Sequence, residues 1–300
     1  MTRQFMNTLR QIAHSDSVGP MHGGWRHLQW QIRKVFRRFP CELPIGDCSR
    51  LFIDHASGVG ALVNAMGLYD FNNMSFLRTL LRRLGGVFVD VGANIGSYTL
   101  IASEVPSSRV FSIEPHPRAF KLLSENVMRN QRSNVTCLSF AVSDCQGWCI
   151  LTDHKELSIN QIVHSKEYQK VVRVPMRTLR SVCEELKITP DFIKIDVEGH
   201  EYSVLNGLID MLTAAKVMWI ERGERPEIVR KLRQSGYMGP LYVHQRTQTL
   251  RLIPANRPED PVFVRRDCVA LLERCNFQIQ AGVATEDKVQ PVMAVGSGHA

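Results

Sequence analysis

The chain has 300 residues, of which 44% are hydrophobic and 22% charged, and its formal net charge is +8. This is the composition of a globular protein, and no run of eighteen apolar residues is present that could cross a bilayer. The first thirty residues contain no compact apolar segment typical of a secretory signal. Eight cysteines are scattered without a C-x-x-C pair, so we expect reduced thiols and a cytoplasmic protein. The positive charge permits an anionic partner without naming one.

The first eighty residues contain one clear periodic pattern. Apolar residues recur at helical spacing at Trp25, Leu28, Ile32, Val35 and Phe39, and arginine and lysine residues lie on the other faces. We favour a helix that packs this apolar face on its own core and leaves a solvated basic face. The alternative is a peripheral contact of residues 25–39 with an acidic membrane surface. We treat residues 1–83 as an N-terminal helical extension.

Strands and helices alternate from about residue 86 to residue 235. The β-rich runs are Val87–Val91, Arg109–Ile113, Val135–Phe140, Phe192–Asp196 and Val217–Glu221. The helical segments are Gly96–Val105, Arg118–Asn130, His200–Leu212 and Pro226–Gln234. This alternation predicts an α/β fold with a doubly wound, mostly parallel sheet of the Rossmann-like type over residues 84–275.

An unusually long segment, from Ser143 to Thr189, separates the third and fourth strands. It predicts two extra strands at Trp148–Leu151 and Val171–Pro175, followed by a helix at Leu179–Leu186. The polar loop between these strands, Thr152–Lys170, is long enough to cover the sheet edge as a lid.

The end of the chain is less regular. Leu241–His244 and Thr249–Ile253 predict a hairpin that completes the sheet. Residues 276–300 are weakly patterned, and we expect a frayed tail there.

The most specific local pattern ends the first strand, where Val87-Phe-Val-Asp90-Val-Gly92-Ala-Asn94-Ile-Gly96 contains D-x-G-x-x-x-G. Gly92 would let the backbone turn and approach a ligand, and Gly96 would let the helix pack close to the strand. Asp90 would repel the pyrophosphate of a dinucleotide but attract an ammonium and a sulfonium. The pattern favours S-adenosylmethionine over NAD, and its structural alternative is a simple Asp-Gly turn.

Two further strand ends complete a nucleoside site. Glu114 ends the second strand twenty-four residues after Asp90, where a carboxylate can accept hydrogen bonds from both ribose hydroxyls. After the third strand, Ala141 and Val142 could flank adenine, and Asp144 could bind its amine. The plainer interpretation of Glu114 is a surface residue at the start of a loop.

The fourth strand carries charges where a central parallel strand is normally apolar. Lys194 and Asp196 share one face, and Glu198 and His200 follow them. Charges at this end of a sheet indicate a functional site, so we assign Asp196 as catalytic, with Glu198 and His200 in support. Glu221, which ends the fifth strand, is an open candidate. The competing interpretation is that Lys194 extends to solvent and Glu198 caps the next helix.

These motifs, in this order and spacing, resemble the FkbM family of methyltransferases from about Gly67 to Val264. The segments that carry the resemblance are Phe88 to Gly96, Ile113-Glu-Pro115, Asn126, Asn130, Ala141, Asp144, Gly147, Ile193 to Gly199, Glu201, Leu205, Ile220-Glu221 and Gly236-Tyr237. The chain departs from the family pattern at Tyr69-Asp70, where the family often has Tyr-Glu, and at Thr178-Leu-Arg180, where it usually has Thr-Leu-Asp.

The resemblance implies a class I methyltransferase fold and, usually, O-methylation of hydroxyls on sugars, glycolipids, polyketides and similar metabolites. By position, it implies that the methionine end of S-adenosylmethionine is lined by Asp90, Gly92, Asn94 and Gly96. It also implies that Glu114 holds the ribose and that Asp196 lies near the transferable methyl.

We expect a small-molecule or glycan hydroxyl acceptor, and no essential metal, because Glu221 is the only obvious carboxylate partner of Asp196. One alternative is methylation of ribose 2′-hydroxyls in nucleic acid, which the absence of basic residues interleaved with aromatics disfavours. Another is a non-catalytic cofactor-binding or membrane-surface module, which the intact set of Asp90, Glu114 and Asp196 disfavours.

Overall fold

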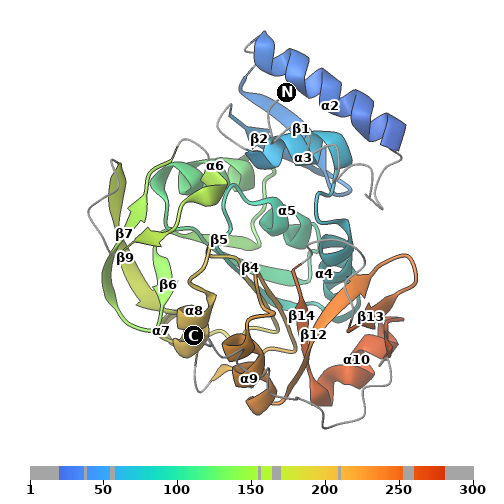
Figure 1. The fold of residues 1–300 in the computed structure, drawn as a ribbon, viewed down its shortest axis with the longest axis vertical. Coiled ribbons are helices and arrows are strands. Elements are labelled where there is room, and N and C mark those ends of the chain that lie inside the picture. The colour runs from blue at the N-terminus through green and yellow to red at the C-terminus, as the bar shows by residue number, and fades with distance from the viewer. Residues whose placement is uncertain are drawn as a thin grey trace, which may run out of the picture.

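The computed structural model describes residues 20–36, 39–54, 58–154, 157–163, 170–208, 211–252 and 260–280. Within these residues the central sheet has nine strands in the order β15-β13-β12-β14-β11-β10-β3-β4-β5 (Figure 1). Five consecutive strands of this sheet are parallel: β3 (Gly86–Val91), β4 (Ser108–Ile113), β5 (Val135–Leu138), β10 (Phe192–Ile195) and β11 (Val217–Ile220). The predicted α/β fold with a mostly parallel sheet is confirmed.

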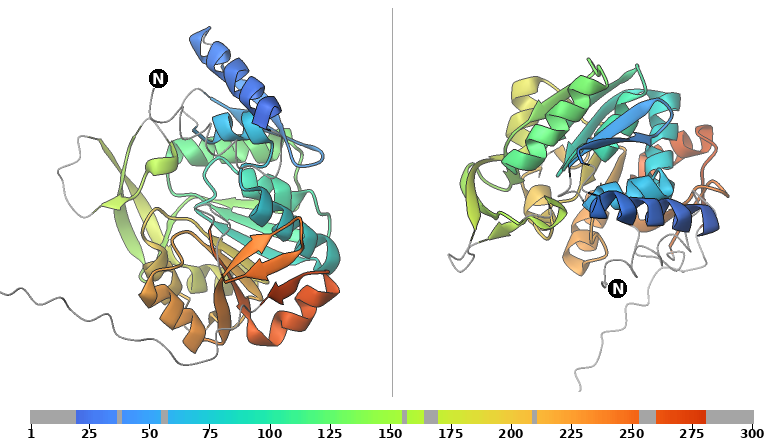
Figure 2. Two further views of the ribbon diagram at one scale, coloured as in Figure 1. Left: turned by 45° about the vertical axis from the view of Figure 1, so that its right-hand side comes forward. Right: turned by 90° about the horizontal axis from the view of Figure 1, so that it is seen from above.

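Helices cover both faces of this sheet (Figures 1 and 2). Successive strand residues point to opposite faces, so Phe88 and Phe192 belong to one core and Val89 and Ile193 to the other. The first core is shared with α4 (Phe71–Leu84), α5 (Ser97–Ser103), α6 (Pro117–Arg129) and α10 (Val269–Arg274). The second is shared with α7 (Leu179–Leu186), α8 (Glu201–Asn206) and α9 (Pro226–Gln234). The sheet is therefore doubly wound.

The insertion between β5 and α7 forms a second sheet. Its order is β6-β9-β7-β8, with β6 at Ala141–Ser143, β7 at Gly147–Thr152, β8 at Ile162–Val163 and β9 at Val171–Thr178. The two predicted extra strands are thus confirmed, and β6 and β8 are additional. A short 3₁₀ turn, η1 (Leu157–Ile159), lies in the segment that we expected to act as a lid.

The carboxyl-terminal strands differ from the prediction. The hairpin of β12 (Tyr237–His244) and β13 (Thr249–Arg251) is confirmed, but β14 (Val262–Arg265) lies between it and β11. The expected frayed tail is wrong for residues 276–280, because β15 (Gln278–Gln280) pairs with β13 and Phe277 is fully buried. Residues 281–300 lie outside the described residues.

The N-terminal extension is not purely helical. It contains α2 (Pro20–Val35), a hairpin of β1 (Cys41–Ile45) and β2 (Ser49–Ile53), and α3 (Gly58–Met66). Buried residues of all four elements belong to the same core as α4 and α5, so residue 83 does not separate two cores. Within the described residues, no helix is long and apolar enough to cross a membrane.

The favoured orientation of the first helix is wrong. The side chains of α2 that are buried are His27 and Trp30, whereas Trp25, Leu28 and Val35 of the predicted inward face are exposed. The reason is that Trp30, on the opposite side of the helix, is buried instead: it lies close to Gly60 of α3 and packs edge-on against Phe39, with ring centroids 5.2 Å apart.

Asn126 of α6 connects β2 to the central domain through hydrogen bonds to backbone groups. Its Oδ1 accepts from the Phe52 amide at 2.6 Å, and its Nδ2 donates to the carbonyls of Phe52 at 3.0 Å and Ile95 at 2.8 Å. We expect Asn126→Ala to lower the free energy of unfolding by about 2–4 kcal/mol in urea denaturation, because unpaired buried backbone groups cost about 1–3 kcal/mol each. The control is Lys121→Ala on the exposed side of α6, expected to change it by less than about 0.5 kcal/mol. Equal effects of the two substitutions would contradict this role.

Candidate active site

A cavity of about 730 Å³ lies at the carboxyl ends of the central strands. It is placed where β3 and β10 are neighbours and the strand order reverses, the usual position of a ligand site in an open α/β sheet. The opposite wall comes from α2, α3 and the η1 segment. The described part of the predicted lid therefore does line the cavity, through Leu157, Ile159 and Asn160.

Negative groups dominate this cavity. Among the described residues that line it, six carry a carboxylate and one is a lysine. The carboxylates are Asp90, Glu114, Asp196, Glu198, Glu221 and Asp260, and the lysine is Lys194. Since burial removes much of the solvent screening, this excess of negative charge favours a cationic ligand.

Lys194 is the buried cation of the site. Its side chain is only 4% exposed, its Nζ donates to Asp196 Oδ2 at 2.5 Å, and it lies 4.8 Å from the ring centroid of Tyr98. Burial lowers the pKa of Lys194, but Asp196 and further acidic groups raise it by more, so the lysine stays charged. The interpretation that Lys194 extends to solvent is therefore wrong.

Asp90 ends β3 beneath the cavity. It is 1% exposed and accepts a hydrogen bond from Thr99 Oγ1 at 2.7 Å, and that hydroxyl lies 2.7 Å from Ser112 Oγ. Burial raises the pKa of Asp90 to about 6, against the opposing effect of Lys194. The carboxylate is held in a fixed orientation but is incompletely compensated by positive charge.

Glu114, at the end of β4, is anchored by backbone amides. Its Oε2 accepts from the Asn94 amide at 2.8 Å and its Oε1 from the His116 amide at 2.8 Å. Because an ionised carboxylate offers about four acceptor positions, two remain for a ligand. Burial raises the pKa of Glu114 to about 7, although the two amides lower it.

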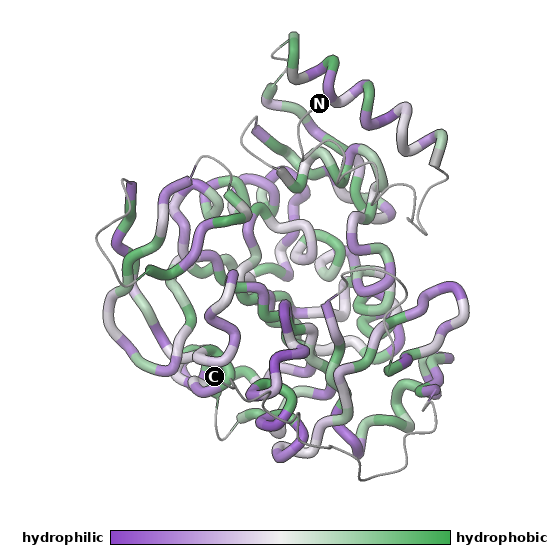
Figure 3. Tube along the Cα trace, viewed as in Figure 1, coloured by the Kyte–Doolittle hydropathy of each residue, from purple (hydrophilic) through white to green (hydrophobic). Residues whose placement is uncertain are grey.

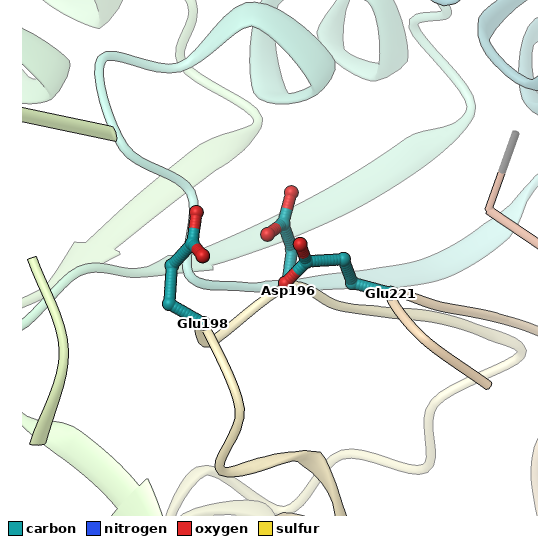
Figure 4. A group of neighbouring side chains, drawn as sticks. All are labelled: Asp196, Glu198 and Glu221. Carbon is teal, nitrogen blue, oxygen red and sulfur yellow. The ribbon is translucent and has the colours of Figure 1, made fainter. Parts of the chain in front are cut away.

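Asp196, Glu198 and Glu221 form a carboxylate cluster whose side chains point toward one another (Figure 4). One oxygen of each lies within 4.8 Å of the others, so the three could together hold a metal ion. Arg222 contacts two of them, with Nη2 3.0 Å from Glu198 Oε2 and Nε 3.6 Å from Glu221 Oε1. The structure thus adds Glu198 to Glu221 as a partner of Asp196.

Glu221 is the least compensated member of this cluster. Its Oε2 is buried and has no hydrogen-bond partner among the described residues. Burial, followed by the charges of Asp196 and Glu198, raises the pKa of Glu221 to about 8. Burial also raises the pKa of Glu198. Glu198 faces the cluster instead of capping α8, whose N-cap residue is His200.

Gly92 takes the backbone turn that we predicted, whereas Gly96 packs against another element than expected. Gly92 has φ +82, and a Cβ there would lie 1.8 Å from the Asp196 carbonyl oxygen, so glycine is required where β3 and β10 meet. Gly96 has φ +94, and a Cβ added there would lie 2.7 Å from Leu123 Cδ1. The close contact at Gly96 is therefore with α6, whereas we had predicted one with the strand β3. Gly96 does not line the cavity.

The cavity brings together most of the predicted site residues. Eight of them line it: Asp90, Gly92, Asn94, Glu114, Ala141, Val142, Asp196 and Glu198. Three do not. They are Gly96, Asp144 and His200. Asp144 is exposed to solvent just after β6. The His200 ring contacts Ser143 instead of the cavity, with Nε2 2.8 Å from Ser143 Oγ. The structure does not place the Asp144 carboxylate or the His200 ring among the residues that line this cavity, so the ligand contact of Asp144 and the supporting role of His200 stay predictions.

Several lining residues were not predicted. His116 follows Glu114 by two residues, and its place beside a strand end was a signal that could have identified it. Tyr69 stands at a position of the family pattern that we had not assigned to the site, whereas Asp260 and Gln31 lie far from the motifs in the sequence and had no such signal. Burial lowers the pKa of His116, whose Nε2 lies 3.2 Å from Asp153 Oδ1.

Known proteins share this sequence pattern. Residues 90–251 match the family described as the methyltransferase FkbM domain. The chain is 30% identical over 183 residues to the hexuronic acid methyltransferase AglP of Haloferax volcanii, covering 60% of this chain and 70% of that protein. It is 27% identical over 187 residues to the methyltransferase sdnD of Sordaria araneosa, covering 50% and 72%. A solved precorrin-6y C5,15-methyltransferase from Geobacter metallireducens is similar with a TM-score of 0.35 and 17% identity, covering 56% and 71%.

The pH dependence of stability tests the raised pKa of Glu114. Its carboxyl has an ordinary pKa of 4.5 but one of about 7 when buried, so between these values the folded state binds a proton that the unfolded chain has released. The free energy of unfolding therefore falls as pH rises from about 5 to 8. We expect Glu114→Gln to reduce this fall by at most about 3 kcal/mol in urea denaturation at several pH values. The control is Glu227→Gln at an exposed position on α9. A Glu114→Gln profile parallel to that of the parent would contradict the shift.

Proposed function

We propose a function for this chain from its family and its cavity. The chain belongs to the FkbM methyltransferase family, because the match at residues 90–251 covers more than half of it. In this proposal it transfers a methyl group from S-adenosylmethionine to a hydroxyl of a sugar, glycolipid or secondary metabolite. The observation that carries this proposal is the cavity with six carboxylates and one lysine at the carboxyl ends of the parallel strands.

The residues present fit this cofactor. It carries an ammonium and a sulfonium, which a net negative cavity attracts and which a phosphate-binding loop would not. Asp90 lies at the end of β3 on the methionine side of the proposed site, and Glu114 retains acceptor capacity for ribose hydroxyls. A volume of about 730 Å³ is in the range of small-molecule sites. When bound, S-adenosylmethionine supplies an electrophilic methyl group on its sulfur.

The acceptor is a hydroxyl compound in this proposal. The relative AglP is named for a hexuronic acid, which supports a sugar acceptor. The same carboxylates disfavour nucleic acid, because it carries a negative phosphate at every nucleotide, whereas a uronic acid carries a single carboxylate and a neutral sugar none. We assign the acceptor to the side of the cavity that α2, α3 and η1 line, because the strand ends would hold the cofactor.

Asp196 is our first candidate for the group that accepts the hydroxyl proton. A hydroxyl becomes a good nucleophile only as its proton leaves, and a positioned base contributes about 10²–10⁴-fold to the rate. Lys194 fixes the Asp196 carboxylate through the 2.5 Å ion pair, and one oxygen each of Glu198 and Glu221 lies within 4.8 Å of an Asp196 oxygen. Glu221, with a pKa of about 8, is the competing candidate because its basicity suits proton transfer near neutral pH.

Substitution of Asp196 tests both the function and this assignment. We expect Asp196→Asn to lower kcat about 10²–10⁴-fold while calorimetry still detects S-adenosylhomocysteine binding, because the amide keeps the shape but cannot accept a proton. Activity is measured as S-adenosylhomocysteine release with a panel of glycosides and uronic acid glycosides.

Glu221→Gln and Glu198→Gln are the matched variants, and thermal unfolding checks that each protein folds. If Asp196→Asn keeps its turnover and Glu221→Gln loses it, the proton acceptor is Glu221. If the parent chain binds neither S-adenosylmethionine nor S-adenosylhomocysteine, the proposed function itself is wrong.

We further propose that catalysis needs no divalent metal. Lys194 pairs with Asp196, and Arg222 pairs closely with Glu198 and more distantly with Glu221, so protein cations already compensate much of the cluster's charge. Dialysis against EDTA is therefore expected to leave kcat within about twofold of its starting value. The same dialysis in an EDTA-free buffer is the control. Loss of activity that added Mg²⁺ or Mn²⁺ restores would identify Asp196, Glu198 and Glu221 as a metal site.

A further inference from the structure

One side of α2 is apolar and exposed. Met21, Trp25, Leu28, Ile32 and Val35 follow one another at intervals of four, three, four and three residues, which places them in one row along the helix. Their exposed fractions are 91, 59, 47, 47 and 76%. We call this row the α2 strip. Exposed apolar patches of this kind on a soluble protein mark interaction sites.

The packing of α2 fixes the direction in which the strip points. On the opposite side of the helix, Trp30 is 1% exposed and packs against Phe39. Asn64 of α3 donates to the Arg26 carbonyl at 2.7 Å. α2 lies across α3 at the periphery of the molecule (Figures 1 and 2), and hydrophobic residues recur along it (Figure 3). Rotation of the strip into the core would expose Trp30.

The charges of α2 are all positive. The helix contains no aspartate or glutamate, and His22, Arg26 and Arg33 recur at intervals of four and seven residues, so they form one flank of the strip. The sequence adds further basic residues at Lys34, Arg37 and Arg38. An apolar row beside a basic flank, without acidic residues, is the pattern of helices that lie in the interface of anionic membranes.

We propose that the α2 strip docks onto the surface of an anionic lipid bilayer. The apolar side chains enter the boundary between headgroups and acyl chains, and Arg26 and Arg33 bind lipid phosphates. A second copy of the chain could cover the apolar row but would bring two basic flanks together, whereas anionic headgroups neutralise them. The helix has sixteen residues and lies on the membrane without spanning it.

Docking would bring the cavity close to the bilayer. His27 and Gln31 lie on α2 and line the cavity, so one wall of the site belongs to the same helix as the strip. The docking proposal does not depend on the methyl-transfer proposal.

Vesicle binding tests the proposal. The full chain is sedimented with vesicles of phosphatidylcholine alone and with vesicles that also contain phosphatidylserine. We expect stronger binding to the anionic vesicles and weaker binding at high salt, because salt shortens the Debye length from about 10 Å at 0.1 M to about 3 Å at 1 M. Trp25→Ser combined with Ile32→Ser should weaken binding at least about tenfold, since two large apolar side chains are lost. Arg26→Glu combined with Arg33→Glu should weaken binding to the anionic vesicles specifically.

The control variant combines Met128→Ser and Trp148→Ser, two exposed apolar residues on α6 and β7, at 70 and 59% exposure. It should bind vesicles like the parent, and thermal unfolding should show that all variants fold. The proposal is overturned if the parent binds neither kind of vesicle. It is equally overturned if the α2 strip variant, Trp25→Ser combined with Ile32→Ser, binds vesicles as strongly as the parent does. It is also overturned if sedimentation velocity shows a parent dimer that the strip variant dissociates, because a second copy then covers the strip.

Discussion

The ion pair between Lys194 and Asp196 is the interaction on which the site depends. A charge in the middle of a parallel sheet costs several kcal/mol unless a partner compensates it, and here each residue compensates the other at 2.5 Å. The single ammonium also reduces the repulsion among the carboxylates that end the neighbouring strands. It does not cancel that repulsion, because the pKa values of Asp90, Glu114 and Glu221 remain raised. The remaining negative charge is what a cationic ligand would compensate.

The parallel sheet provides the geometry for this concentration of charge. Strands β3, β4, β10 and β11 run in the same direction, so the charged residues at their ends meet at one edge, although Asp90 and Asp196 are more than one hundred positions apart in the chain. The approach is close enough that Gly92 contacts the Asp196 carbonyl. The opposite side of the cavity comes from α2, α3 and the insertion. The cavity thus combines strand ends of the central sheet with residues of the N-terminal elements and the insertion.

The predictions from sequence were most accurate where a local pattern coincides with a physical requirement. Alternating apolar strands and helices predicted the doubly wound sheet, and carboxylates directly after strands predicted Asp90, Glu114, Asp196 and Glu198 as cavity residues. The predictions were wrong where only packing partners decide. The helical spacing of Trp25, Leu28, Ile32 and Val35 was correct, but periodicity does not reveal which of two apolar sides is buried, and the large ring of Trp30 determined it. In the same way β14 was missed, because a four-residue apolar strand has no periodic pattern to separate it from a loop.

The sequence by itself determined the fold class, the family and the strand ends at which the charged residues lie, because these depend on the order of local motifs along the chain. Only the tertiary structure decided which charged groups meet. It joined Glu198 and Glu221 to Asp196, turned His200 toward Ser143, left Asp144 in solvent and brought Asp260 into the cavity. The physical reason is that electrostatic interaction and burial depend on distances in space, which the separation of residues along a chain does not specify.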